Sequence, residues 1–188
     1  MGDCIVSSGA AAGVPIGIAT GTRPRLWQFV EVVIDTLQTL PSFVYLIPVV
    51  MLFRVGDFTA MIAIILYALA PAIRYTALGI REVDPGVVEA ATAMGATRAQ
   101  ILFRIRLPLA LPSILLGINQ TIMLALSMLV ITALVGTRDL GQEVYIALVK
   151  ADVGRGLMAG VGVAMIAMIA DRLMTASAVR LKRRLGLG

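Results

Sequence analysis

Six polar or charged side chains interrupt otherwise apolar stretches of this 188-residue sequence. Four are ionisable and two are amides: Asp35, Arg74, Asp171, Arg172, Asn119 and Gln120. Paired carboxylates can act as acid and base, but neither Asp35 nor Asp171 lies in a recognisable catalytic motif. The sequence has no histidine, a single cysteine and no GxxxxGK[ST] phosphate loop. Because histidine triads, cysteine or histidine metal clusters and phosphate-loop ATP binding are thereby excluded, we expect no enzyme, no metal and no cofactor.

The composition places these side chains in a membrane. Apolar residues make up 59% of the chain and charged residues 14%, and the mean hydropathy is +0.94. A soluble domain has about 45–50% apolar and about 25% charged residues, and one of this size could not bury so much apolar surface. The net charge of +5 is spread between apolar runs, so we expect a lipid bilayer and not a nucleic acid as the partner.

Five apolar stretches approach the roughly 20 residues that cross a bilayer as a helix. They cover residues 5–20, 32–53, 59–80, 112–135 and 157–176. We expect an all-α, polytopic membrane helix bundle of about five transmembrane helices, forming one domain over residues 1–188. Gly9, Gly13, Gly17 and Gly21 share one helical face, which favours close approach of another helix. The alternative is that glycine is simply frequent in membrane helices.

The two amides leave two interpretations open. Asn119 and Gln120 either border a translocation path or hydrogen-bond neighbouring helices, and we favour the path. Ser127 and Thr132 are expected to bond back to their own helix.

The ionisable side chains are expected to lie toward one mouth of the bundle. An ion-pair network of Asp35, Arg74, Asp171 and Arg172 would lower the cost of burying all four charges. Snorkelling to the headgroups is the alternative, and it is favoured for Arg172. Pro41, Pro48 and Pro71 are expected to bend their spans.

The distribution of basic residues predicts the orientation. Ten lie on one side of the expected spans: Arg23, Arg25, Arg81, Arg98, Arg104, Arg106, Arg180, Lys182, Arg183 and Arg184. Four lie on the other: Arg54, Arg138, Lys150 and Arg155. This bias predicts an external N-terminus and a cytoplasmic C-terminus. The external segment 137–156 carries apolar residues at helical spacing, which predicts a short surface helix with Asp139 as its cap and Gly154 after its end.

The cytoplasmic segment 81–111 predicts two short helices joined by a bend. Asp84 is a candidate N-cap of the first helix and Gly95 a candidate left-handed C-terminal residue. Thr97-Arg98-Ala99-Gln100 has the form of a capping box that starts the second helix, which Pro108 is expected to stop.

Two short helices cannot cover all the apolar side chains of this segment, which include Ile101, Leu102, Phe103 and Ile105. The segment therefore needs a partner, or it lies on the membrane surface as an amphipathic hairpin. Composition alone does not separate these alternatives.

Glu89-Ala90-Ala91, then Gly95, then Ile105-x-Leu107-Pro108 at the matching spacing resemble the EAA signature of permease subunits in binding-protein-dependent ABC importers. Segments such as 117–128 and 169–172 resemble the glycine betaine/proline betaine permeases, and the likeness covers about residues 10–175. It implies a type I ABC importer permease-like fold in a bacterial inner membrane. Members of the family usually have more apolar sequence before the matching residues, so we expect an N-terminus that is truncated relative to the family, with a misplaced start as the alternative. The implied ATPase-coupling residues are Glu89, Ala90, Ala91, Gly95, Ala96, Ile105, Leu107 and Pro108.

The resemblance implies inward transport of glycine betaine or a related quaternary-ammonium solute. The implied partners are a cytoplasmic ATP-binding subunit that hydrolyses the ATP, a second permease copy and an extracytoplasmic substrate-binding protein. No tight aromatic cluster is visible in the sequence, which agrees with selection of the solute by that separate binding protein. The same machinery carrying choline, carnitine or proline is the alternative, and a non-transporting membrane scaffold is a remote one.

Overall fold

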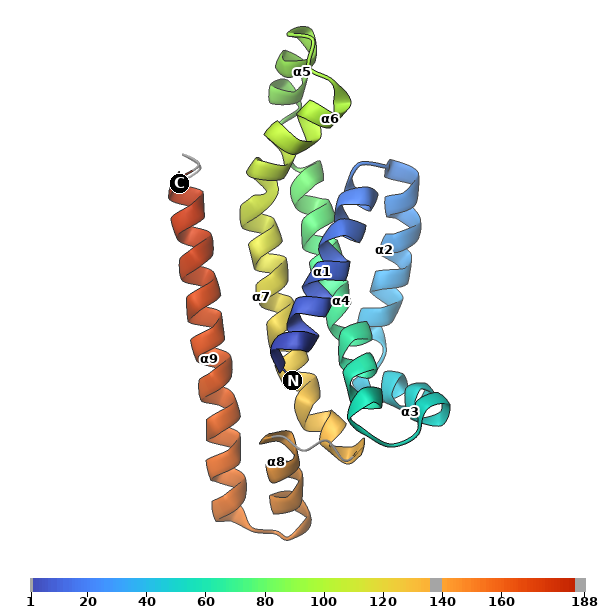
Figure 1. Cartoon of the computed structure of the whole chain (residues 1–188), viewed down its shortest axis with the longest axis vertical. Helices are drawn as coiled ribbons and strands as arrows, with labels where there is room; N and C mark the ends of the chain where they lie inside the picture. Colours follow the sequence, from blue (N-terminus) through green and yellow to red (C-terminus); the bar gives the residue numbers. More distant parts are fainter. Residues whose placement is uncertain (1, 136–139, 185–188) are drawn as a thin grey trace.

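The computed structural model describes residues 2–135 and 140–184, and every regular element in that part of the chain is a helix. In chain order these are α1 (Gly2–Gly21), α2 (Pro24–Thr39), α3 (Ser42–Phe53), α4 (Asp57–Arg81), α5 (Pro85–Ala93), α6 (Arg98–Ile101), a π-helical turn (Leu102–Arg106), α7 (Leu107–Thr132), a 3₁₀ turn (Ala133–Val135), α8 (Leu140–Val149) and α9 (Val153–Arg184). Helices α5 and α6 project from one end of the bundle, and α3 and α8 lie at the other (Figure 1). The predicted all-α class is confirmed.

The number of membrane-length helices is smaller than the expected five. Within the described residues, three helices are long and apolar enough to span a membrane: Asp57–Arg81, Arg98–Thr132 and Val153–Arg180. The pair α2 and α3 makes a fourth if a bent pair is counted as one span. The first expected span corresponds to a shorter apolar helix, Ala12–Gly21.

The second expected span, residues 32–53, is broken between α2 and α3. The two helices meet at an angle of 106°. Leu40 is extended, with φ −74° and ψ 136°, because the following proline ring disfavours the helical conformation before it. Pro41 also has no N–H to donate, so α2 ends just before it. The bend that we expected at Pro41 is therefore a complete break between two helices. Pro48 and Pro71, in contrast, stand inside α3 and α4, which run on through them.

Helices α1 and α4 approach closely through the predicted glycine face. A Cβ added to Gly13 would lie 2.6 Å from the Cβ of Ala72, and one added to Gly17 would lie 2.6 Å from the Cβ of Thr76. At Gly21 the nearest atom would be the Cα of Ala77, at 3.1 Å. Gly13 and Gly17 leave no room for a Cβ and Gly21 leaves little, so the prediction of close helix packing is confirmed for these three positions.

Helix α4 packs on its other side against α7. A Cβ at Gly79 would lie 2.6 Å from the Cβ of Ser113, and one at Gly117 would lie 2.8 Å from the Cβ of Tyr75. Further along the pair, Met128 of α7 is fully buried in a cluster with alanine and isoleucine side chains of α4. Helix α4 is therefore the centre of the fold, in contact with α1, α2, α3 and α7.

Helix α9 stands at the side of the bundle (Figure 1). It contacts mainly α7 and α8, and none of its membrane-spanning part is buried within this chain. Its apolar side chains are exposed along its length, including Leu157, Met165, Ile169 and Leu173. This helix therefore presents most of its surface to lipid or to another chain.

Candidate functional site: the α5–α6 hairpin and the polar pairs between helices

The α5–α6 hairpin begins and bends where local chemistry predicts. The Asp84 carboxylate accepts a hydrogen bond from the backbone N–H of Gly86 at 2.8 Å, and Pro85 occupies the first turn of α5. Gly95 follows α5 with φ +82°, a left-handed conformation that favours glycine. The Ala96 N–H then donates to the Ala91 carbonyl at 3.0 Å, which closes the end of α5.

Both hydrogen bonds of the predicted capping box start α6. The Gln100 N–H donates to the Thr97 Oγ1 at 3.3 Å, and the Thr97 N–H donates to the Gln100 Oε1 at 2.8 Å. Each side chain thus satisfies a backbone donor that the helix end would otherwise leave free. The predictions for Asp84, Gly95 and the capping box are confirmed.

The expected stop at Pro108 is wrong. Helix α6, the π-helical turn and α7 form one continuous stretch, Arg98–Thr132, of 35 residues. In the π-helical turn the Leu107 N–H donates to the Leu102 carbonyl, five residues back. This wider turn moves the carbonyls away from the Pro108 ring, so the proline enters α7 without ending the helix. The second arm of the hairpin is therefore continuous with a membrane-length helix.

The residues implied to couple to an ATPase divide by exposure. Glu89, Ala90 and Gly95 are exposed at the tip of the hairpin, whereas Ala96, Ile105, Leu107 and Pro108 are half-buried. Ala91 is buried, at 5% exposure, inside the hairpin. The tip therefore offers a surface made of small side chains and one carboxylate.

Apolar side chains on the hairpin lack cover from the chain itself. Met94 is 82% exposed and Phe103 is 64% exposed. Ile101, by contrast, is buried. The expectation that this segment cannot cover all its apolar side chains is confirmed for Phe103.

The ionisable side chains between the helices form two separate contacts instead of one network. Arg74 of α4 forms an ion pair with Asp35 of α2. Asp171 of α9 accepts a hydrogen bond at 2.8 Å from the Asn119 side-chain amide of α7. Arg172 is exposed, as the snorkelling alternative predicts. The expected network of all four side chains is therefore wrong. Asp35 and Arg74 join α2 to α4, whereas Asp171 joins α9 to α7 through Asn119.

Asn119 of α7 faces α9 and is 6% exposed. Its amide oxygen, Oδ1, has no hydrogen-bond partner among the described residues. Gln120 is half-buried. The Ser127 hydroxyl donates to the Met123 carbonyl of its own helix at 2.9 Å, as expected. The Asn119–Asp171 hydrogen bond links α7 to α9, and sequence spacing alone could not pair these two residues, which are 52 positions apart.

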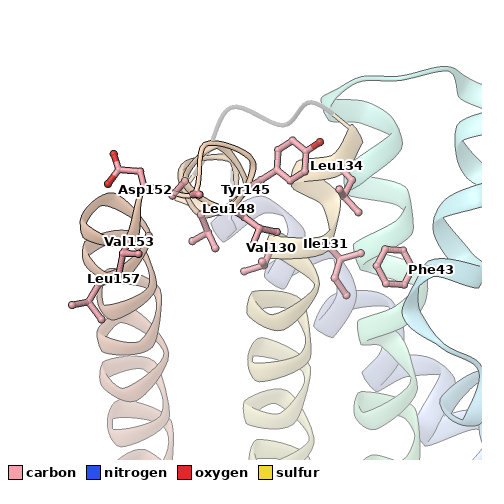
Figure 2. A pocket seen from close by; sticks show the side chains of 13 residues that line it. Phe43, Val130, Ile131, Leu134, Tyr145, Leu148, Asp152, Val153 and Leu157 are labelled. Atoms are coloured by element: carbon pink, nitrogen blue, oxygen red, sulfur yellow. The ribbon is translucent and has the colours of Figure 1, made fainter.

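At the opposite end of the bundle, α7, α8, α9 and α3 surround an apolar groove of about 650 Å³. Figure 2 shows Val130 and Ile131 of α7, Leu148 of α8, Leu157 of α9 and Phe43 of α3 around it. Sequence reasoning missed this groove, because its walls come from helices far apart in the chain.

Helix α8 occupies the place of the predicted short helix, but the turn after it differs from the prediction. The helix ends at Val149, Ala151 adopts φ +52° and Gly154 lies in the first turn of α9. The Asp152 carboxylate accepts a hydrogen bond from the Arg155 N–H at 3.1 Å, so the aspartate starts α9 before the glycine is reached. Asp139, the predicted cap of α8, lies outside the described residues.

An ion pair fastens this turn. The Arg155 side chain bonds the Glu143 carboxylate of α8, with Nε at 2.7 Å and Nη2 at 2.5 Å from Oε2.

Among the described residues, no three His, Cys, Asp or Glu side chains gather in a way that could hold a metal ion.

A bundle of helices that pack through small residues, with a capped hairpin at one end, is the architecture expected of a helical permease of an ABC importer. The model of the binding-protein-dependent transport system inner membrane component family matches residues 13–183, and the chain belongs to that family. The chain is therefore an inner-membrane, multi-pass protein, and its resemblance to the EAA permeases is confirmed.

Two curated relatives indicate which members of the family this chain resembles. The glycine betaine/proline betaine transport system permease protein ProW of Escherichia coli is 43% identical over 87% of this chain. The glycine betaine transport system permease protein OpuAB of Bacillus subtilis is 44% identical over 92% of it. The chain spans 46% of the first relative's length and 61% of the second's.

A solved structure confirms the fold. A chain of the MetNI methionine ABC transporter, in an inward-facing conformation, superposes with a TM-score of 0.82 at 19% identity. The match covers 96% of this chain and 92% of the other. The predicted type I importer permease-like fold is therefore correct.

Proposed function

We propose that this chain is the permease subunit of an ABC importer that moves glycine betaine, or a related quaternary-ammonium compatible solute, into the cell. The observation that carries the proposal is the hairpin: its caps, its left-handed Gly95 and its exposed Glu89 and Ala90 reproduce the EAA pattern as a projecting, rigid element. The choice of solute rests on the similarity to ProW and OpuAB, which are glycine betaine permeases.

ATP hydrolysis belongs to a separate subunit in this proposal, and the hairpin tip is where that subunit docks. Glu89, Ala90 and Gly95 are exposed there, and the small side chains allow close approach. Met94, at 82% exposure, supplies apolar surface beside them. The Glu89 carboxylate would orient the ATPase on the hairpin, and the apolar Met94 surface would contribute to the binding affinity.

The continuous Arg98–Thr132 stretch provides the mechanism of force transmission. A displacement of the hairpin by the ATPase moves α7 as one body, because no stop intervenes at Pro108. The Asn119–Asp171 hydrogen bond then couples α7 to α9, and the Asp35–Arg74 ion pair couples α4 to α2. Movement at the hairpin thus becomes tilting of the membrane helices around a path.

The assembly proposed here has two permease copies, two ATPase subunits and an extracytoplasmic binding protein. Three or four spans per chain are too few to enclose a polar path comfortably, and the exposed α9 leaves surface for a neighbour. In this proposal the hairpin and the C-terminus lie in the cytoplasm and the N-terminus lies outside, an orientation that the bias of basic residues supports. Asn119 and Gln120 are the proposed path-bordering residues, with helix packing by Asn119 as the competing role.

Reconstitution tests the whole proposal. The chain is co-expressed with candidate ATPase and binding-protein partners and placed in liposomes, and ATP-dependent uptake of labelled glycine betaine is measured. Competition with unlabelled choline, carnitine and proline identifies the preferred solute. Copurification of an ATPase without uptake of any solute would favour the scaffold alternative. A topology tag at Thr97 that reports an external position would overturn the docking of a cytoplasmic ATPase.

A further inference from the structure

A second groove, of about 490 Å³, lies between the base of the hairpin and the turn that joins α1 to α2. Its lining includes Thr22, Val88, Arg98, Ile101, Phe103 and Arg106. Among the described residues that line it, none is acidic. The groove therefore combines two guanidinium groups with an apolar wall.

The Arg106 side chain in this groove has an unpaired hydrogen-bond donor. Its Nε is buried and has no hydrogen-bond partner among the described residues. A buried charged donor without a partner is costly, and an arginine fork matches the oxygens of a phosphate. Arg98, on the same groove, adds a second cation from α6. An anionic phosphate placed between the two guanidinium groups would compensate their charge, which no acidic residue of the lining offsets.

The position of the groove favours a lipid as the source of that phosphate. Thr22 directly follows Gly21, the last residue of α1, so the groove lies where the bundle ends. The hairpin rises beyond this level, next to the α1–α2 turn (Figure 1). Headgroups occupy this depth in a bilayer. The exposed Phe103 ring and the side chains of Val88 and Ile101 offer apolar contact to a glycerol backbone and the upper acyl chain.

The groove is distinct from the proposed ATPase-docking surface. A separate hollow at the tip of the hairpin is lined by Met94, Gly95, Ala96 and Arg104, among others, and the two share no lining residue. None of the eight residues implied to couple to the ATPase lines the groove. A ligand could therefore occupy it while the tip is docked.

We propose that this groove binds the phosphate group of an anionic phospholipid through Arg98 and Arg106, and so ties the base of the hairpin to the membrane surface. The proposal does not depend on which solute the protein carries. It concerns a lipid contact of the permease chain itself, on the side of the hairpin away from its tip.

Ligand-dependent thermal stability of the purified chain in a neutral detergent tests the proposal. The probes are short-chain phosphatidylglycerol, short-chain phosphatidylcholine and inorganic phosphate, each titrated while the unfolding midpoint is recorded. Phosphatidylglycerol is expected to raise the midpoint saturably, at a lower concentration than either of the other probes. In Arg106→Gln and in Arg98→Gln the concentration needed is expected to rise about tenfold or more.

Arg104→Gln is the matched control, because Arg104 belongs to the same π-helical turn but lines the hollow at the tip. It is expected to respond like the unaltered chain. Arg98 is exposed, so its variant remains testable if Arg106→Gln fails to fold. An equal loss in Arg104→Gln, or an equal response to phosphatidylcholine, would reduce the effect to general surface charge and overturn the proposal. An equal response to inorganic phosphate would overturn its assignment to lipid.

Discussion

Helices α4 and α9 are both long enough to cross a membrane, yet they obtain their packing partners differently. Helix α4 is held on two sides by α1 and α7, through glycines that leave no room for a Cβ. Helix α9 has glycines too, but a Cβ at Gly160 or Gly162 would meet nothing within 4 Å. The first arrangement builds the fold of one chain, and the second leaves a face for lipid or for another protein.

The hairpin resembles α9 in this respect. Its shape is fixed by its own caps, but the surfaces of Met94 and Phe103 stay open. This contrast predicts that changes in the α1–α4–α7 core alter stability, whereas changes on open surfaces alter binding or transport and leave stability nearly unchanged. Four predictions test that division, in order of decreasing expected effect.

Gly17→Ala is expected to destabilise the protein by about 2 kcal/mol or more, because its Cβ would lie 2.6 Å from the Thr76 Cβ and 2.9 Å from the Ile73 carbonyl oxygen. Gly160→Ala, on the open face of α9, is the control and is expected to cause no loss. Equilibrium unfolding in mixed detergent micelles measures both. Equal stability of the two variants would contradict the contrast between core and open surface.

Gly95→Asp is expected to reduce ATP-dependent solute uptake about tenfold or more while the protein still inserts and folds. The added side chain meets open space, so it causes no clash, but it places a charge on the proposed docking tip at φ +82°. Gly95→Asn is the control, since asparagine tolerates the same backbone conformation without the charge. Uptake and folded yield are measured on the same preparations. Normal uptake by the aspartate variant would remove the tip from the coupling mechanism.

Thr97→Ala is expected to weaken the hairpin by about 1 kcal/mol, because the Gln100 N–H would lose its acceptor. Amide hydrogen exchange should accelerate about fivefold at the start of α6, with the global unfolding midpoint unchanged. Thr92→Ala is the control, because the Thr92 hydroxyl only bonds back to the Val88 carbonyl of its own helix. Faster exchange across the whole bundle would mean that the hairpin and the core unfold together.

The sequence predicted those structural features that depend on interactions between residues close together in the chain. The Asp84 cap, the Gly95 bend and the Thr97–Gln100 box depend on neighbours two to five residues away, and all three are present. The glycine face of α1 was predictable because spacing alone places it. The span assignment failed at Leu40–Pro41, where apolar composition concealed a break between two helices.

The remaining errors have two other causes, a local change of helix type and tertiary structure. Pro108 is accommodated by a π-helical turn that composition does not reveal. Asp171 bonds Asn119, 52 residues away, and Asp35 pairs with Arg74 across two helices. A list of polar side chains in apolar stretches predicts that each needs a partner. It does not say which one, because that depends on how the helices pack.

The smallest expected effect concerns the border between the packed core and α9. In a double-mutant cycle with Asn119→Leu and Asp171→Leu, we expect a coupling free energy of about 0.6 kcal/mol, the usual value for a hydrogen bond between membrane helices. Ser127→Ala replaces Asn119→Leu in the control cycle and should show no coupling to Asp171, because Ser127 bonds within its own helix. Unfolding free energies and uptake are measured for every variant. If Asn119→Leu lowered uptake without any coupling in stability, Asn119 would border the path and not serve to hold α9; coupling in stability with unchanged uptake would assign it to packing.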